Sequence, residues 1–236
     1  MAPPTTLDPD APTGGDTTDG DDTDGKPKPL LRGWFHLVAF VVMLVGGPIL
    51  VAHGRTASQR LVLVVYVVAI LALFGVSAAF HRITWSPDAR RRMRRADHST
   101  IFLAIAGSYT AVAGLALHGW ARLTILLIVW IGAAGGIALR QLWLDAPKWA
   151  VAVPYVVVGW SAVAVVPQLV RGLGGAGFIL LLAGGAAYTA GAVVYALKKP
   201  DPSPTVFGYH EIFHACTIVG AGFHFAVIAF VALPRT

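Results

Sequence analysis

The feature that most constrains this chain is a series of seven apolar runs, each about long enough to cross a lipid bilayer. They cover approximately residues 34–52, 61–80, 99–117, 123–139, 149–170, 175–197 and 209–233. A helix needs roughly 20 mainly apolar residues to span a hydrocarbon core of about 30 Å. The runs are continuous rather than alternating, which disfavours a strand barrel. The sequence therefore predicts an all-α, polytopic membrane protein with seven transmembrane helices.

The composition excludes a soluble globular protein. Hydrophobic residues make up 56% of the chain and charged residues only 13%, whereas about 25% of the residues in a typical soluble domain are charged. The one cysteine, Cys216, rules out a disulfide within the chain. Its apolar surroundings favour a small buried side chain.

Charge is distributed unevenly along the chain. Seven of the 12 acidic residues fall in the first 25 residues, which contain no Lys or Arg, although the net charge of the whole chain is +6. Residues 1–30 are also rich in Pro, Thr and Gly, so we expect a disordered acidic tail there and the seven-helix domain in residues 31–236. Basic residues beside a bilayer attract anionic headgroups. We therefore expect membrane lipids as partners, and no nucleic acid.

The distribution of Lys and Arg predicts the orientation of the helices. If successive loops alternate between the two sides, 13 of the 18 lie on the side of the N-terminus and the other five lie opposite. Cytoplasmic loops are enriched in Lys and Arg. The N-terminus is therefore expected inside the cell and the C-terminus outside. The basic run at residues 90–95 is expected in a loop that anchors the protein to lipid headgroups.

This topology brings three polar segments to one depth, near the cytoplasmic face. The second predicted helix ends there at His81, the third begins there at Asp97, and the seventh begins there with His210 and His214. The last two histidines are four residues apart. Their side chains therefore lie on one face of a helix, about one turn apart, and can reach the same ion.

Three neutral imidazoles in this arrangement predict an open zinc site. Such a site keeps a water in its fourth position and lowers the pKa of that water toward ~7, which makes it a nucleophile. The expected ligands are His81, His210 and His214. Asp97 is expected to orient or deprotonate the water, or to accept a hydrogen bond from a ligand imidazole and so hold it in place. Ser77, one turn from His81, is expected to donate to a substrate carbonyl or its oxyanion; the alternative is a hydrogen bond to the carbonyl one turn back.

The other histidines are assigned other roles. Three stand alone at helix ends and are expected at the membrane interface: His36, His53 and His118. His98 is rotated by about 100° from Asp97 around its helix, so we expect it to face a neighbouring helix or the headgroups. His224 lies about 21 Å along the helix from His210. It is therefore too distant for the same ion and is expected in the core or the outer leaflet.

The segment that starts at His210 also matches the H-E-x-x-H signature of metalloproteases, in which the glutamate, here Glu211, is the general base. An intramembrane metalloprotease would normally take its third ligand from a carboxylate on a later helix. No acidic residue follows Glu211 in this chain, and the remaining candidate is Asp145, which precedes it. This alternative leaves His81 and Asp97 without a role.

Small residues are dense in the fourth and sixth runs. Gly132 and Gly136 have GxxxG spacing, and Gly184, Gly185 and Gly191 lie in the sixth run. Small residues let helix backbones approach closely in lipid. We therefore expect these glycines to mark helix contacts rather than a functional site.

The motifs around the polar residues resemble those of the haemolysin III family. This is the bacterial branch of the progestin and adiponectin receptor (PAQR) family, within a wider group of membrane hydrolases that includes alkaline ceramidases. The matching segments are S-x-x-x-H at 77–81, A-D-H-S-T-I-F at 96–102, A-G-S-Y-T at 106–110 and G-Y-H-E-I-F-H at 208–214. The resemblance covers essentially all of the chain past the tail.

The resemblance implies seven helices with an inside N-terminus, and a zinc ion held by three histidines with an aspartate on the metal-bound water. Carried over residue by residue, these are His81, His210, His214 and Asp97, with Ser77 as a further family residue. The chain departs from the family pattern in two places. Phe80 stands where the family often has Tyr, and Ala111 where it often has Pro. The first change removes a hydroxyl near the metal, and the second is expected to leave the third helix straighter.

Together these features predict a multi-pass protein of the bacterial inner (plasma) membrane that hydrolyses a lipid amide or ester with zinc. The alternative is a non-enzymatic lipid sensor or receptor-like module, in which a structural zinc braces the helices. The family name refers to cytolysis, but no segment of this chain resembles a pore former.

Overall fold

The computed structural model describes residues 29–143 and 145–236. Within these residues the protein is helical, with no strand beyond one isolated bridge, which confirms the predicted fold class. The helices are α1 (Trp34–Ala52), α2 (Ala57–Arg82), α3 (Pro87–Ala116), α4 (Gly119–Leu142), α5 (Lys148–Gly159), α6 (Val166–Leu197) and α7 (Tyr209–Ala226). A 3-10 turn, Ser161–Val165, joins α5 to α6. The predicted acidic tail lies almost entirely outside the described residues.

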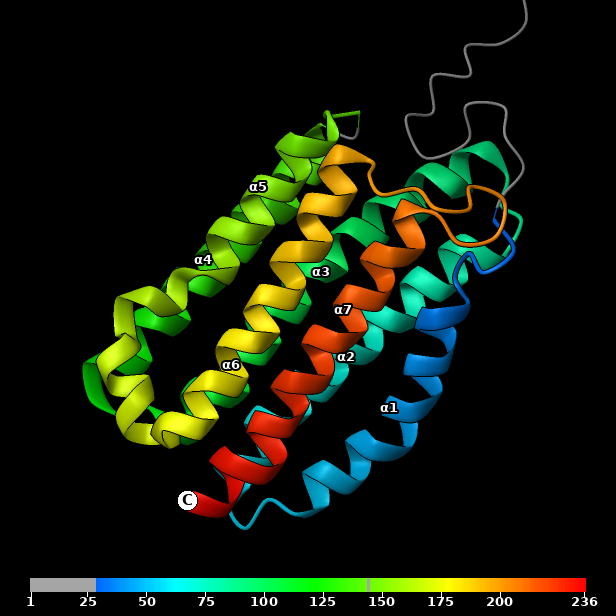
Figure 1. Ribbon diagram of the computed structural model, residues 1–236. Helices are drawn as coiled ribbons and strands as arrows, with labels where there is room; N and C mark the ends of the chain where they lie inside the picture. The colour runs from blue at the N-terminus through cyan, green and yellow to red at the C-terminus, as the bar shows by residue number, and fades with distance from the viewer. Residues whose placement is uncertain (1–28, 144) are drawn as a thin grey trace, which may run out of the picture.

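The helices lie side by side in a bundle (Figure 1). Neighbours in the chain pack against each other from α1 to α4, α6 packs along α7, and α7 also contacts α1. The third helix contacts α2, α4, α5 and α6, so it lies at the centre of the bundle. Residues that α3 places near the start of α7 are therefore enclosed by several helices.

Six stretches are long and apolar enough to cross a membrane. The fifth, Ala152–Leu197, contains 46 residues, which as one straight helix would be roughly 69 Å long, more than twice the hydrocarbon core. It is not straight: Gly174 has non-helical angles (φ 71°, ψ 171°), and the chain reverses direction between α5 and α6 (Figure 1). The number of seven crossings and the orientation of the termini stay predictions.

The third helix begins earlier than predicted. It starts at Pro87, which occupies the first turn, so residues 90–95 are helical and the expectation of a loop there was wrong. Proline is favourable at a helix start because its missing N–H needs no partner there. Arg94 is buried and pairs with Asp145, beyond the end of α4. The sequence prediction missed this extension because it followed hydropathy, and these turns are basic.

Tyr109 of α3 supports the break between α5 and α6. Its hydroxyl donates to the carbonyl oxygen of Gly159 at 2.6 Å and accepts from the N–H of Ala162 at 2.8 Å. Backbone groups that leave a helix inside a bilayer must find partners within the protein. The hydroxyl of Tyr109 therefore supplies a partner from α3 to both of these backbone groups.

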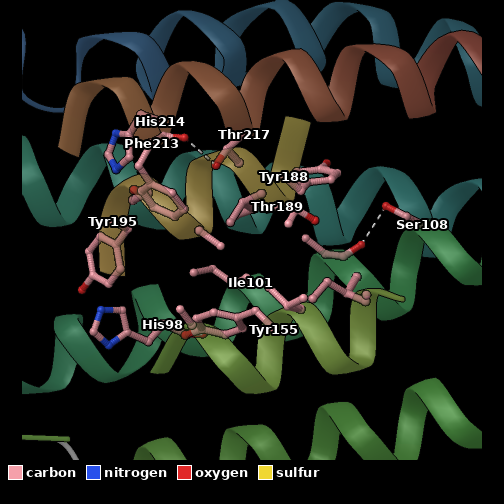
Figure 2. A pocket seen from close by; sticks show the side chains of 18 of the residues that line it. His98, Ile101, Ser108, Tyr155, Tyr188, Thr189, Tyr195, Phe213, His214 and Thr217 are labelled. Atoms are coloured by element: carbon pink, nitrogen blue, oxygen red, sulfur yellow. Dashed lines mark hydrogen bonds between the residues drawn. The ribbon is translucent and has the colours of Figure 1, made fainter. Parts of the chain in front are cut away.

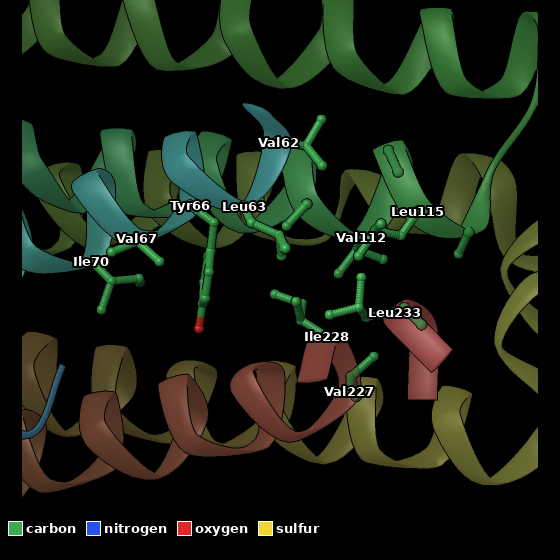
Figure 3. Packing of buried hydrophobic residues seen from close by; sticks show 14 of the residues in the cluster. Val62, Leu63, Tyr66, Val67, Ile70, Val112, Leu115, Val227, Ile228 and Leu233 are labelled. Carbon is green, nitrogen blue, oxygen red and sulfur yellow. The ribbon is translucent and has the colours of Figure 1, made fainter. Parts of the chain in front are cut away.

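Buried apolar side chains hold the bundle together away from the polar end of α7. Figure 3 shows Leu63 and Tyr66 of α2 facing Ile228, which lies just beyond α7, with Val112 of α3 beside them. These residues are all buried. At the opposite end of α7, two residues that precede α1 donate backbone hydrogen bonds to the loop between α6 and α7. The N–H of Leu30 donates to the carbonyl oxygen of Thr205 at 3.0 Å, and that of Leu31 donates to the carbonyl oxygen of Val206 at 3.2 Å.

Most of the predicted helix contacts at glycine are present. A Cβ added at Gly132 would meet Val158, and at Gly136 it would meet Phe102. Gly184 and Gly191 are equally tight, against side chains of α7. Gly185 differs, because a Cβ there would meet nothing within 4 Å. It lines a cavity instead.

Candidate metal centre

Three histidines from α2 and α7 converge at one end of the bundle. His81, His210 and His214 are all buried, and their candidate ligand nitrogens lie within 4.8 Å of one another. The Nε2 atoms of His81 and His210 are 3.2 Å apart. Two nitrogens bound to one tetrahedral zinc at 2.0–2.1 Å lie about 3.3 Å apart. The donor set therefore fits a metal ion in both chemistry and spacing.

Local sequence explains why these side chains meet. His210 and His214 occupy successive turns at the start of α7, as their spacing predicts, with ring centroids 4.5 Å apart. His81 lies in the last turn of α2, where Phe80 packs against its ring at 4.8 Å. Because α2 and α7 are far apart in sequence, only the folded bundle assembles the group.

A fourth histidine contacts the group. His36 of α1 stacks on His214, with ring centroids 3.9 Å apart and an angle of 7° between the planes. It is only 2% exposed, so its assignment to the membrane interface was wrong. His36 lies in the first turn of α1, which packs mainly against α2 and also contacts α7. Nothing in the local sequence signals the contact with His214. His53 and His118 are exposed at helix ends, as expected.

The contacts of Glu211 differ from those expected of the general base of a metalloprotease. Its carboxylate accepts from the Arg32 Nε–H at 2.5 Å and from the backbone N–H of Gly208 at 2.9 Å. It is 1% exposed and closes the first turn of α7 as a cap. Glu211 therefore fixes the start of the helix that carries two of the histidines, which argues against its use as a general base.

The two other predicted site residues lie in the wall of an adjoining cavity. Ser77 of α2 and Asp97 of α3 line it together with His210 and His214, and both are buried. The cavity lies between helices and is partly open; together with the open space at its mouth it comprises about 1140 Å³. Figure 2 shows it extending from His214 at one end toward Ser108.

Most of the cavity wall is apolar. Leu73, Ile101 and Ile105 contribute to it, and so does the side of α6 at Gly185. His224 also lines it, where its ring lies 5.3 Å from that of Tyr188. This position agrees with the prediction that His224 is too distant from His210 for the same ion and lies in the core or the outer leaflet. The cavity thus has the histidine group at one end and a mostly apolar wall along its length.

Sequence reasoning did not place His98 in this wall. His98 was expected to face a neighbouring helix or the headgroups, and it does contact α4 through Arg140. It also lines the cavity. Adjacent residues on a helix can both border a wide cavity, because 100° of rotation still leaves them on the same half of the helix.

Comparison with known proteins agrees with the motifs. The sequence model of the haemolysin-III related family matches residues 25–225. The chain belongs to the haemolysin III family. Hemolysin-3 of Bacillus cereus is 33% identical over 182 residues, which cover 77% of this chain and 80% of that protein. The Hemolysin-3 homolog of Bacillus subtilis is 31% identical over 182 residues, covering 77% of this chain and 82% of that protein.

The likeness of this haemolysin III protein extends to animals. The human monocyte to macrophage differentiation factor is 25% identical over 197 residues, which cover 82% of this chain and 79% of that protein. The residues that match the family model, 25–225, include His81, His210 and His214. A multi-pass membrane protein follows from the family together with the six apolar stretches.

Proposed function

We propose that this protein is a zinc-dependent hydrolase of a lipid amide or ester, embedded in the bacterial plasma membrane. The observation that carries the proposal is one site in which three buried histidines adjoin a long apolar cavity, with Asp97 and Ser77 in its wall. The ligands are His81, His210 and His214. Zinc, when bound, supplies a Lewis acid and an acidified water at neutral pH.

The remaining chemistry belongs to side chains of the cavity wall. Asp97 accepts the proton of the attacking water and returns it to the departing amine or alcohol, as a general base and then a general acid. Ser77 donates its hydroxyl to the carbonyl oxygen, where negative charge develops. Both groups come from helices whose positions are fixed by packing, so little reorganisation is needed.

The cavity supports a lipid as substrate. Its wall is mostly apolar beyond the histidine end, and apolar surface favours an acyl chain over a peptide, whose backbone groups would lose their hydrogen bonds there. The site lies within a membrane protein, so lipids can enter from the bilayer. Ceramides and phospholipids are the classes to assay.

The test is an Asp97→Asn variant assayed in nanodiscs on ceramides and phospholipids. Turnover should fall by about 10²- to 10⁴-fold, the usual contribution of a general base, while zinc content and thermal stability stay near those of the wild type. His53→Ala, at an exposed helix end, is the matched control and should keep full activity. Unchanged turnover in Asp97→Asn would contradict the role of Asp97.

A second candidate is a non-enzymatic lipid sensor in which the metal braces the helices. The stacking of His36 on His214 and the pairing of Arg32 with Glu211 favour it, because both tie α7 to the N-terminal part of the chain. A sensor would bind lipid and zinc but show no turnover in the wild type. The same nanodisc assay therefore separates the two candidates.

A further inference from the structure

A buried arginine lies close to the cavity but outside the predicted site. Arg140, near the end of α4, is only 2% exposed and is the largest of the fully buried side chains. Its Nη1–H donates to the carbonyl oxygen of Trp143 at 3.1 Å, and its Nη2 lies 2.5 Å from Nδ1 of His98. Burying a guanidinium is costly unless specific contacts compensate. The contact with His98 is one of the contacts that compensate for the burial of Arg140.

The direction of this hydrogen bond follows from the chemistry of arginine. A guanidinium has five N–H donors and no acceptor. Nδ1 of His98 must therefore accept, and the ring of His98 carries its proton on Nε2. The orientation of an imidazole ring is commonly fixed in this way, by the partner of its other nitrogen.

The rest of His98 is also held in place. Tyr155 of α5 donates its hydroxyl to the backbone carbonyl oxygen of His98 at 3.1 Å. The side chain lines the cavity that His210 and His214 also line. Figure 2 shows the ring of His98 at the same end of this cavity as His214 and Tyr195.

We propose that His98 is a substrate-binding residue whose Nε2–H donates a hydrogen bond to an acceptor oxygen of the lipid in the cavity, and that Arg140 is the positioning residue that fixes this tautomer. The inference rests on the proposed function for the identity of its ligand, a lipid with a carbonyl group. It adds a second polar contact beside the histidine group and Asp97. Such a contact favours acyl lipids over plain hydrocarbon chains.

The tautomer is measured by ¹⁵N NMR of histidine-labelled protein in nanodiscs. The signal that disappears in His98→Gln is assigned to His98 and should have the shifts of an Nε2–H ring. In Arg140→Met this signal should move toward a mixture of tautomers. Gln141→Leu, which removes a neighbouring hydrogen bond to Ser99, is the matched control and should leave it unchanged. An Nδ1–H ring in the wild type, or an unchanged ring in Arg140→Met, overturns the role of Arg140.

Ligand contact is measured with heptadecyl methyl ketone, which has a carbonyl acceptor but no hydrolysable bond. Affinity in nanodiscs should fall by about 5- to 10-fold in His98→Leu, the usual effect of losing one neutral hydrogen bond, and by less in His98→Gln, which keeps an N–H donor. Octadecane, which has no acceptor, should bind both variants and the wild type equally. Equal ketone affinity in His98→Leu and the wild type, or no preference for the ketone over octadecane, overturns the contact.

These results do not depend on catalysis. The ketone is not turned over, so a protein without hydrolase activity still gives a clear result for His98. Conversely, a negative result for His98 leaves the Asp97→Asn assay valid. Failure of this inference and failure of the proposed function are therefore distinguishable.

Discussion

At the scale of single residues, the contact that most affects the histidine group is the stacking of His36 on His214. The two rings are parallel within 7° and their centroids are 3.9 Å apart. The ring of Phe74 also packs against His36, with the two centroids 5.1 Å apart. A ligand ring held in this way has already lost the rotational freedom that metal binding would otherwise remove. The neighbours that orient metal ligands commonly change metal affinity by about 10- to 100-fold.

Replacing His36 therefore has a predictable effect on the metal. His36→Ala should weaken zinc binding by about tenfold, because the ring of His214 loses its support. His36→Phe keeps a flat ring against His214 and should stay within about threefold of the wild type. Competition with a chromophoric chelator measures both values. Equal affinity in His36→Ala and the wild type would show that stacking does not orient the ligand.

The convergence of the three histidines was predictable, but the residues that support them were not. His210 and His214 share a helix face by spacing alone, and alternating topology puts His81 at the same depth. His36 and His98 each owe their roles to contacts between helices. Those contacts depend on the rotation of each helix about its axis, which hydropathy does not determine. The ion pair of Glu211 was not predictable for a related reason, since its partner Arg32 lies 179 residues away.

At the scale of helices, the start of α7 is held by an ion pair as well as by its cap. Arg32 and Glu211 are 9% and 1% exposed at their side chains. Removing one partner of a buried pair leaves an uncompensated charge, which costs about 3–5 kcal/mol. Loss of either partner alone is therefore expected to destabilise the helix end that carries His210.

Glu211→Gln should lower the free energy of unfolding by about 3 kcal/mol while leaving the metal bound at saturating zinc. Arg32→Met with Glu211→Gln should recover part of that loss, because no unpaired charge remains. Thermal unfolding in one detergent, followed by circular dichroism, compares them. If Glu211→Gln kept full stability but lost all hydrolysis, Glu211 would be the general base after all.

The glycines of α4 provide a matched pair of substitutions. A Cβ at Gly136 would lie 2.1 Å from the buried ring of Phe102, whereas a Cβ at Gly135 would meet nothing within 4 Å. Gly136→Ala should destabilise the protein by about 1–3 kcal/mol through overpacking. Gly135→Ala should be neutral or stabilising by up to about 1 kcal/mol, because alanine favours helix. Equal melting temperatures would contradict close contact between α3 and α4.

At the scale of the whole molecule, the structure relates the two ends of the described chain to the bundle. The segment before α1 donates backbone hydrogen bonds to the loop between α6 and α7, at the end of the bundle where the three histidines lie. Thr236 accepts from the Gln59 side chain in the first turn of α2, at the opposite end. Figure 1 shows the C-terminus far from the start of α1. An odd number of crossings would give this separation.

The predicted orientation is tested by labelling from one side. In a Cys216→Ser background, Ser86→Cys lies before α3 and Thr236→Cys at the end of the chain, and both positions are exposed. A membrane-impermeant maleimide added to intact cells should label Thr236→Cys and leave Ser86→Cys unlabelled until the cells are opened. The reverse pattern would place the histidine end outside the cell.

The central claim is that the three histidines hold a zinc ion. Its most direct test is elemental analysis of the protein purified in detergent, with wild type, His53→Ala and a folded His210→Ala, His214→Ala double variant side by side. We predict about one zinc per chain in the first two, as for a site with three imidazole ligands, and none in the double variant. A well-folded wild type without metal, or equal metal in all three, would contradict the account.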